Sequence, residues 1–357
     1  MNQTDSTVPD DFFREIPKVD IHCHLYGTIR EATLKEFARE AEAPITDAEI
    51  SGYYIRGEKP KGVLHAFRFM EEHILGNPER LHRVTFECLE DLSSEAVRYA
   101  EIFWNSTGTL KHHAGLTFKD VQAAITAAMI DARKAFGIEA RLIHAIDRQA
   151  SPEEAVVMVQ RMLQHEDESV VGIGIDYLET GHPPEGFWKA YQMARDAGYK
   201  TTAHAGEFGC HWRNVETAIK LLKVDRLDHC YTILESPDLV HECIERDLVV
   251  TVVPTNSYYM RTLEPCEWAD KHPIREMARR GLKIHPNTDD PTFHNVTPAL
   301  VWKMMHEAFG YGLPDLRTFT LNGLDGAWID EKVRADWKKQ FASEFDNALK
   351  RHNLSSL

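Results

Sequence analysis

Short runs of β-branched and apolar residues recur along the chain, and each run ends in polar side chains. Longer segments between the runs repeat their apolar residues every three to four positions. This alternation predicts buried strands separated by amphipathic helices. The eight predicted strands are residues 19–24, 97–104, 140–147, 170–177, 200–205, 226–230, 248–254 and 283–289. The predicted helices between them include residues 152–165, 186–197, 215–222 and 273–280.

Eight strands alternating with helices fit either a closed barrel or an open, doubly wound sheet. The open sheet usually carries a glycine-rich phosphate turn after its first strand. Here the first strand continues as His24-Leu25-Tyr26-Gly27-Thr28, which is not a GxGxxG turn. The pattern therefore favours an α/β fold, a (β/α)8 TIM barrel with additional helices over its C-terminal face, as one domain spanning residues 1–357.

Two segments exceed what a minimal barrel needs. The first is an insertion at about residues 30–90, with helical patterns at 30–43 and 61–73 and a turn-rich piece at 52–60. We interpret it as a lid over the barrel mouth, although it could also plug a barrel end or form an oligomer contact. The second is a mostly helical tail beyond Val301.

Charge and composition narrow the range of partners. The net charge of −15 and the lack of a basic patch argue against binding to nucleic acid or to an anionic membrane. The sequence has no long apolar run that could span a bilayer, and its first fifteen residues do not resemble a signal peptide. The six cysteines have no CxxC spacing, which is typical of reduced thiols. We expect a cytoplasmic protein with a small-molecule substrate, and the oligomeric state stays open.

Polar side chains gather where the predicted strands end. His22 and His24 lie two apart on the first strand, so both imidazoles point to the same side. His204, His229 and Asp289 end three later strands. Barrel enzymes keep their active sites at this C-terminal end of the strands.

Three of the imidazoles and one carboxylate suit a metal ion. His22, His24, His204 and Asp289 would offer the nitrogen and oxygen donors that Zn²⁺ prefers and would leave a position for water. A histidine pair on one strand can also be purely structural, so the HxH motif alone decides little.

The motifs, taken in chain order, resemble the signature of the adenosine deaminase family. They are HCHLYG at 22–27, HAGE at 204–207, His229 and NTDDP at 287–291. Further similarities are YAE at 99–101, GID at 174–176 and HPI at 272–274. The resemblance covers most of the chain.

The resemblance implies one zinc ion per subunit, with His22, His24, His204 and Asp289 as its ligands. It makes Glu207 the proton donor, and His229 and Asp289 the groups that orient and deprotonate the zinc-bound water. The implied reaction is hydrolytic deamination of a 6-aminopurine, adenosine or a close analogue, to a 6-oxo purine and ammonia.

Substrate contacts follow the family less closely. The resemblance implies that His24 and Asp290 contact the substrate, with Asp290 on the purine N7 edge. Tyr26 stands where nucleoside deaminases of the family usually carry Asp and adenine deaminases carry Glu. Glu179 replaces a glycine whose N–H meets N3 of the purine. We expect Tyr26 and Glu179 to contact the substrate in place of those residues.

The seventh strand leads to VPTNS at 253–257, in which Asn256 and Ser257 stand in the reverse of the usual family order. Aromatic residues either wall the substrate pocket or pack the barrel mouth; they are Tyr26, Phe103, Trp104, Tyr258 and Tyr259.

Three alternatives to an adenosine deaminase stay open. The substrate could be adenine or another aminated heterocycle. The chain could instead be an amidohydrolase that cleaves an amide, lactone or phosphoester, but many such enzymes use a lysine on strand four, and residues 170–180 contain none. It could also be a catalytically silent binding protein, although every motif residue is present.

Overall fold

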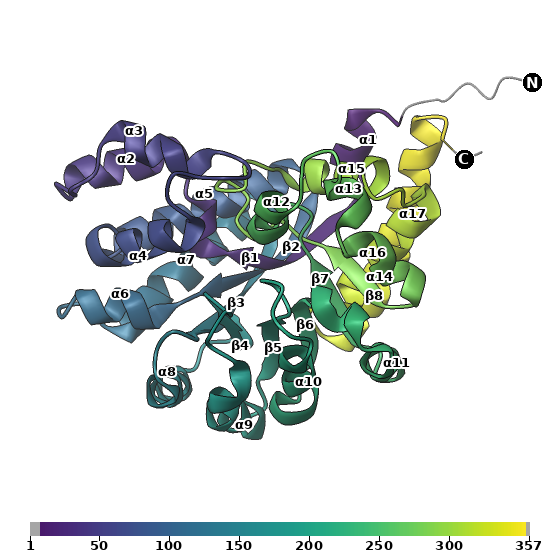
Figure 1. Ribbon diagram of the computed structural model, residues 1–357. Coiled ribbons are helices and arrows are strands. Elements are labelled where there is room, and N and C mark those ends of the chain that lie inside the picture. The colour runs from purple at the N-terminus through teal and green to yellow at the C-terminus, as the bar shows by residue number, and fades with distance from the viewer. Residues whose placement is uncertain (1–7, 355–357) are drawn as a thin grey trace, which may run out of the picture.

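A computed structural model describes residues 8–354, in which eight parallel strands form one sheet with the strand order β1 to β8 (Figure 1). Residues 1–7 and 355–357, which the predicted domain includes, lie outside the described residues. The strands are β1 (Lys18–His24), β2 (Val97–Trp104), β3 (Glu139–Asp147), β4 (Val170–Asp176), β5 (Lys200–Ala205), β6 (Arg226–His229), β7 (Val249–Val252) and β8 (Lys283–Pro286).

The loop after β8 returns to β1 and nearly closes the sheet. The His24 N–H donates to the carbonyl of Asp289 at 2.8 Å, and the Asp289 N–H donates to the carbonyl of His22 at 2.9 Å. The Ile21 N–H donates to the side-chain oxygen of Asn287 at 2.9 Å. The predicted (β/α)8 barrel is therefore confirmed.

Helices follow the strands around the barrel. Before β2 these are α1 (Asp10–Glu15), η1 (Leu25–Thr28), α2 (Glu31–Glu40), α3 (Asp47–Ser51), η2 (Gly52–Tyr54), α4 (Val63–His73) and α5 (Pro78–Ser94). Between β2 and β6 they are α6 (Ser106–His112), α7 (Phe118–Phe136), α8 (Pro152–Gln164), η3 (Pro184–Phe187), α9 (Trp188–Asp196), α10 (Arg213–Thr217) and η4 (Ala218–Leu222). After β6 they are η5 (Tyr231–Glu235), α11 (Pro237–Glu245), α12 (Ser257–Thr262), α13 (Trp268–Lys271), α14 (Ile274–Met277), η6 (Ala278–Arg280), α15 (Pro298–Glu307), α16 (Leu313–Gly326) and α17 (Glu331–Arg351).

All eight predicted strands are observed, and the largest difference is at β8, which ends at Pro286 and not at residue 289. The chain leaves the extended conformation here because Asp289 adopts a left-handed backbone with φ of 64°. His229, at the end of β6, has the same conformation with φ of 62°. Non-glycine residues rarely adopt it, and such strain is concentrated at functional sites.

A buried ion pair fills the N-terminal end of the barrel. Arg226, the first residue of β6, donates to the Glu101 carboxylate at 2.5 Å and to the carbonyl of Ile21 at 2.9 Å. Its guanidinium lies 4.3 Å from the centre of the Trp328 ring. This end of the barrel is thus filled by packed side chains, and the predicted site residues lie at the opposite, C-terminal end.

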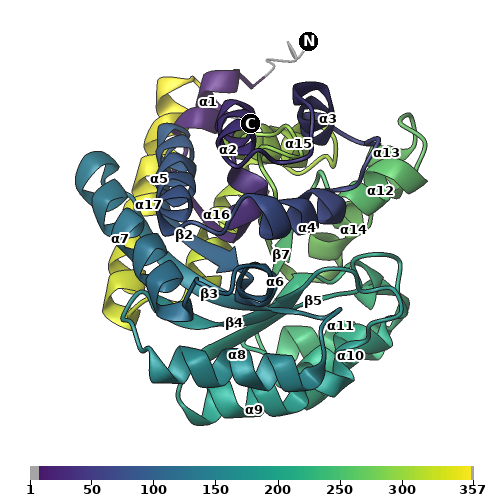
Figure 2. The ribbon, with the colours of Figure 1, turned by 90° about the vertical axis from the view of Figure 1, so that its left-hand side faces the viewer.

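The segment between β1 and β2 covers that C-terminal end. Helix α4 of this segment lies on the side of the barrel that faces the viewer in Figure 2, and α6, which follows β2, lies on the same side. The Lys59 ammonium donates to the carbonyl of Phe293 at 2.7 Å, which ties the turn before α4 to the loop after β8. Helix α5 packs against α7 and β2 as an outer helix of the barrel itself. Within the predicted insertion, the turn before α4 is thus tied to the loop after β8, whereas α5 belongs to the outer layer; the role of the insertion as a lid stays a prediction.

Within residues 8–354, no helix combines the length and the apolar character that crossing a membrane requires.

Candidate metal centre and active site

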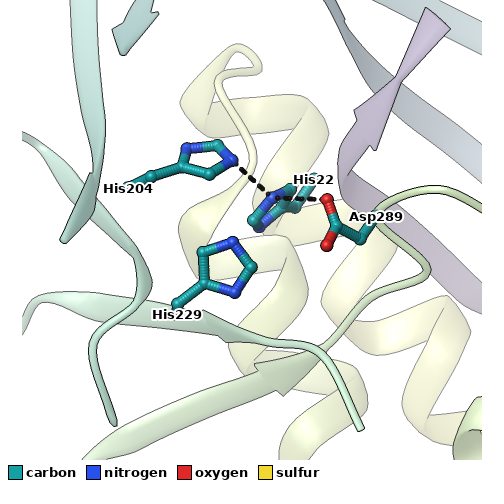
Figure 3. A group of neighbouring side chains, drawn as sticks. All are labelled: His22, His204, His229 and Asp289. Atoms are coloured by element: carbon teal, nitrogen blue, oxygen red, sulfur yellow. Dashed lines mark hydrogen bonds and ion pairs between the residues drawn. The ribbon is translucent and has the colours of Figure 1, made fainter. Parts of the chain in front are cut away.

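The side chains of His22 on β1, His204 on β5 and Asp289 after β8 point at a common centre (Figure 3), and His24 on β1 lies beside them. Nε2 of His204, on β5, lies 3.0 Å from Nε2 of His22 and 3.0 Å from Nε2 of His24, both on β1. Oδ1 of Asp289, after β8, lies 3.3 Å from Nε2 of His22 and 3.2 Å from Nε2 of His24. The structure thus brings together the four residues that the sequence analysis assigns to the metal.

Carboxylates behind the histidines orient their rings. Nδ1 of His204 lies 3.4 Å from an oxygen of Asp228. Nδ1 of His22 lies 2.8 Å from the hydroxyl of Thr251, which itself donates to the other Asp228 oxygen at 2.8 Å. Nδ1 of His24 lies 3.5 Å from Asp176. Each Nδ1 faces an acceptor and so carries the proton, which leaves the Nε2 lone pairs directed at the centre.

Positive charge is favoured at this point. Burial alone would lower the pKa of His24, but Asp176 and Asp289 raise it well above its usual value. Burial alone would raise the pKa of Asp228, but neighbouring His22 and His204 lower it well below its usual range. Three nitrogen donors and one carboxylate oxygen around a cation-attracting point match the ligand preference of zinc.

A fifth residue, His229, faces the same centre from the end of β6. Its ligand nitrogen, those of His22 and His204, and a carboxylate oxygen of Asp289 lie within 4.8 Å of one another. Nδ1 of His229 lies 3.3 Å from the hydroxyl of Tyr231, whose own proton goes to the carbonyl of Val253. Nδ1 therefore donates, and Nε2 keeps its lone pair.

That Nε2 of His229 is buried and has no hydrogen-bond partner among residues 8–354. Burial and the nearby His22 and His204 lower the pKa of His229 well below its usual value. A neutral imidazole with a free lone pair can accept a proton, which is what a general base requires.

Glu207 lies on the loop after β5, opposite His229. Its Oε1 accepts a hydrogen bond from the Asn256 side chain at 2.9 Å, and its Oε2 lies 3.6 Å from Nε2 of His229. Burial, together with the charges of Asp289 and Glu179, raises the pKa of Glu207 well above its usual value. This shift favours the protonated form of the carboxyl group. Because Oε1 accepts an N–H, the proton sits on Oε2.

Asp290 and Gly27 meet beside this group. Oδ1 of Asp290 is buried without a hydrogen-bond partner in the described part of the chain. Burial and the adjacent Asp289 raise the pKa of Asp290 well above its usual value. A Cβ atom at position 27 would lie 2.0 Å from Oδ1 of Asp290, so the glycine of the HCHLYG motif lets the two backbones approach.

Two adjoining cavities lead from the surface to the centre. The inner cavity, about 40 Å³, is lined by His24, Phe67 and His229 among others. The outer cavity, about 420 Å³, is lined by the turn before α4 and by Tyr258 and Arg261 of α12. Both share the following wall residues: Leu64, Glu207, Phe208, Asp289 and Asp290.

Comparison with known proteins places this arrangement in a family. The sequence profile of the adenosine deaminase family matches residues 17–346. The chain belongs to the adenosine deaminase family. Its relatives include an adenine deaminase of Vibrio parahaemolyticus, 28% identical over 92% of this chain and 95% of that one. An adenosine deaminase of Clostridium botulinum is 26% identical over 92% of this chain and 98% of that one.

A crystal structure of an amidohydrolase from Burkholderia ambifaria with bound zinc is also similar. It is 51% identical, covers 98% of this chain and 97% of its own, and has a TM-score of 0.95. The predicted family membership is therefore confirmed.

The polar groups of two expected substrate contacts, Tyr26 and Glu179, are engaged within the protein, and their contact with a substrate stays a prediction. The buried hydroxyl of Tyr26 donates to the carbonyl of Asn105 and lies 2.7 Å from the Thr109 hydroxyl. The Glu179 carboxylate accepts the backbone N–H groups of Gly206 and Glu207, each at 2.8 Å. Both polar groups are already satisfied within the protein and do not line either cavity. Each therefore supports the site from outside the pocket.

Some of the predicted aromatic residues lie near the site or line a cavity, and others pack elsewhere in the barrel. The Phe103 ring lies 5.0 Å from the His24 ring inside the barrel, whereas Trp104 packs at 5.3 Å against His144 in the outer layer. Tyr258 lines the outer cavity. The sequence analysis missed Leu64 and Phe67, which α4 directs into the inner cavity. The sequence showed that Leu64 and Phe67 lie in a helical pattern, but it did not show which part of the protein the apolar face of that helix would cover.

Proposed function

We propose that this protein is a zinc-dependent hydrolase that removes the 6-amino group of a purine, adenosine or a close analogue, to give a 6-oxo purine and ammonia. The observation that carries the proposal is the convergence of three Nε2 atoms and Oδ1 of Asp289 beside Glu207, whose raised pKa favours the protonated form. The metal ligands in this proposal are His22, His24, His204 and Asp289.

A zinc ion in this position would polarise a water molecule and lower its pKa toward about 7. His229 and Asp289 flank the space that this water would occupy. The neutral Nε2 of His229 accepts the proton that the water loses when it attacks C6.

Glu207 acts on the substrate ring. Its Oε2 donates a proton to N1, which makes C6 more electrophilic. Asp290, neutral because of its raised pKa, donates from its unpartnered side chain to N7. The water oxygen forms a bond to C6, and the bond from C6 to the amino nitrogen breaks. That nitrogen leaves as ammonia with the proton that His229 took from the water, and the remaining hydroxyl proton returns to Glu207, so that one water is consumed for each ammonia released.

Adenine is the second candidate substrate, because the Vibrio relative is named an adenine deaminase. The two substrates differ in the group on N9. The outer cavity of about 420 Å³ provides room beside the centre for such a substituent. This space favours a nucleoside over the free base.

Ammonia release across a substrate panel tests the proposal. The panel holds adenine, adenosine, 2′-deoxyadenosine and 5′-modified adenosines, with pterins and triazines as non-purine probes. It also holds N6-substituted adenosines, which would release the substituted amine in place of ammonia and are therefore followed by formation of the 6-oxo purine. We expect turnover of a 6-aminopurine with kcat/KM above about 10⁴ M⁻¹s⁻¹. Ammonia release from non-purines alone would overturn the substrate class.

Glu207→Gln tests the proton donor in the same assay. The amide cannot donate a proton to N1, so we expect kcat to fall by about 10³-fold with zinc content unchanged. Full activity in this variant would refute the proposed role of Glu207.

A further inference from the structure

A buried carboxylate lies directly beneath the loop that carries Glu207. Glu179 follows β4 and is 1% exposed. Its Oε1 accepts the Gly206 N–H at 2.8 Å and the Asn214 side-chain N–H at 2.8 Å. Its Oε2 accepts the Glu207 N–H at 2.8 Å and lies 3.5 Å from the N–H of Phe208. A single side chain thus holds three consecutive peptide groups.

The loop has little else to fix it in this shape. Gly206 adopts a left-handed backbone with φ of 69°, which turns the chain sharply after β5. The resulting run of N–H groups points inward, away from water. A buried N–H group without an acceptor is destabilising, so the acceptor at position 179 stabilises the loop in this shape.

A buried arginine balances the charge of Glu179. Nη1 of Arg148 lies 3.9 Å from Oε1 of Glu179, and both side chains are fully buried. Arg148 also donates to the carbonyl of His204, immediately before the loop. The guanidinium therefore contacts both Glu179 and the residue before the loop, and its charge offsets the cost of burying the Glu179 carboxylate.

We propose that Glu179 is a positioning residue for the proton donor: by accepting the N–H groups of Gly206 and Glu207, it sets the height and direction of the Glu207 side chain over the purine N1. This inference rests on the proposed role of Glu207. Asn256 holds the other end of the same side chain through Oε1. Glu207 is thus fixed at its backbone by Glu179 and at its carboxyl group by Asn256.

The first test is Glu179→Gln. Either orientation of the amide places its NH2 group against an N–H donor of the loop or of Asn214, which pushes the loop away. A displacement of about 1 Å costs about 10²-fold in rate, so we expect kcat to fall by about that factor. KM should stay within about threefold and zinc content should be unchanged, because binding groups outside the loop are intact. An unchanged kcat would overturn the proposal.

The matched control is Glu87→Gln, the same chemical change in a largely buried carboxylate on α5 that hydrogen-bonds Thr33. We expect its kcat to match that of the wild type. If Glu87→Gln lowers kcat as much as Glu179→Gln does, the effect is a general cost of removing a buried charge and the proposal fails.

The double variant Glu179→Gln/Glu207→Gln separates this inference from the proposed function. If Glu179 acts through Glu207, the second substitution adds no further loss to Glu207→Gln. Multiplying losses would overturn the inference while leaving Glu207 as the donor. Full activity of Glu207→Gln alone would refute the proposed function instead.

Asn214→Asp keeps the inference testable if Glu179→Gln does not fold. Asn214 is only partly buried, and the new carboxylate would lie about 2.8 Å from Oε1 of Glu179 and repel it. We expect a fall in kcat of at least about 10-fold with KM and zinc content retained. Wild-type kcat in this variant would contradict the proposal.

Discussion

Position 27 has no room for a side chain, because a Cβ there would lie 2.0 Å from Oδ1 and 2.7 Å from Cα of Asp290. The nearest atoms include backbone, so the loop after β8 must move to accept a methyl group. We expect Gly27→Ala to lower kcat/KM for the purine by about 10- to 100-fold, because Asp290 is displaced from N7. Steady-state kinetics measure this loss.

Gly115→Ala is the control for that substitution, since a Cβ at position 115 meets nothing within 4 Å. Its kcat/KM should equal that of the wild type. Equal kcat/KM in Gly27→Ala as well would show that Asp290 does not contact the substrate.

Asn256 has two functions that one substitution can separate. Its side-chain oxygen accepts the N–H of Tyr258 at 3.1 Å and caps α12, while its side-chain nitrogen donates to Glu207. Asn256→Asp keeps the cap and removes the donor, so we expect near-wild-type thermal stability but a kcat at least about 10-fold lower. Differential scanning fluorimetry and initial rates measure the two effects. A stable variant with full kcat would contradict the account of Glu207.

At this scale the sequence predicts the residues whose function follows from position on a strand. The side chains of His22 and His24 face inward because they lie two apart on β1, and Asp289 follows the last strand. The roles of Tyr26 and Glu179 depend on partners far along the chain, Asn105 and the loop at 206–208. The residues that surround Tyr26 and Glu179 in the sequence do not indicate which distant residues these side chains contact.

Arg68 is one of the residues that hold helix α4 over the pocket. Arg68 contacts the Asp147 carboxylate at 2.6 Å and the Glu71 carboxylate at 3.1 Å, and its guanidinium lies 4.0 Å from the Tyr177 ring centre. The same helix supplies Phe67 to the inner cavity. Removing this contact should free α4 without touching the metal ligands.

We therefore expect Arg68→Met to raise KM by about 10-fold, to leave zinc content unchanged and to speed hydrogen exchange in α4. Arg39→Met, which removes an exposed ion pair with Asp47 on α2 and α3, should change neither quantity. Unchanged KM and exchange in Arg68→Met would show that other contacts hold α4.

The strands were predictable as elements because apolar runs of strand length alternate with helical periodicity. Whether a given helix belongs to the insertion or to the outer layer of the barrel was harder to predict. The amphipathic pattern of α5 fits either an insertion or the outer layer, and only its packing against α7 and β2 decides between them.

At the scale of the whole molecule, two buried histidines should each reduce stability in mild acid, while the buried Glu71, whose pKa is raised to about 7, acts in the opposite direction. Burial lowers the pKa of both His144 and His272 to about 3, whereas an unfolded histidine titrates near 6.5. Below pH 6.5 the unfolded chain therefore binds protons that the folded chain excludes. The free energy of unfolding then falls as the pH falls, by up to about 1.4 kcal/mol per pH unit for each such histidine.

Urea unfolding at pH 7.0 and 5.5 measures this loss, and His144→Phe isolates one contribution. Phenylalanine keeps the packing against Trp104 and Phe118 but cannot titrate. The variant should lose about 1 kcal/mol less than the wild type between the two pH values. An equal loss would mean that His144 is charged in the folded protein.

The central claim is that His22, His24, His204 and Asp289 hold one zinc ion on which deamination depends. Its most direct test is to measure zinc content and ammonia release on the same samples of purified protein, after chelation and during stepwise return of zinc. We predict that activity disappears with the metal and recovers in proportion to zinc up to one ion per chain, and that Asp289→Ala recovers neither. Full ammonia release from zinc-free protein would contradict the account.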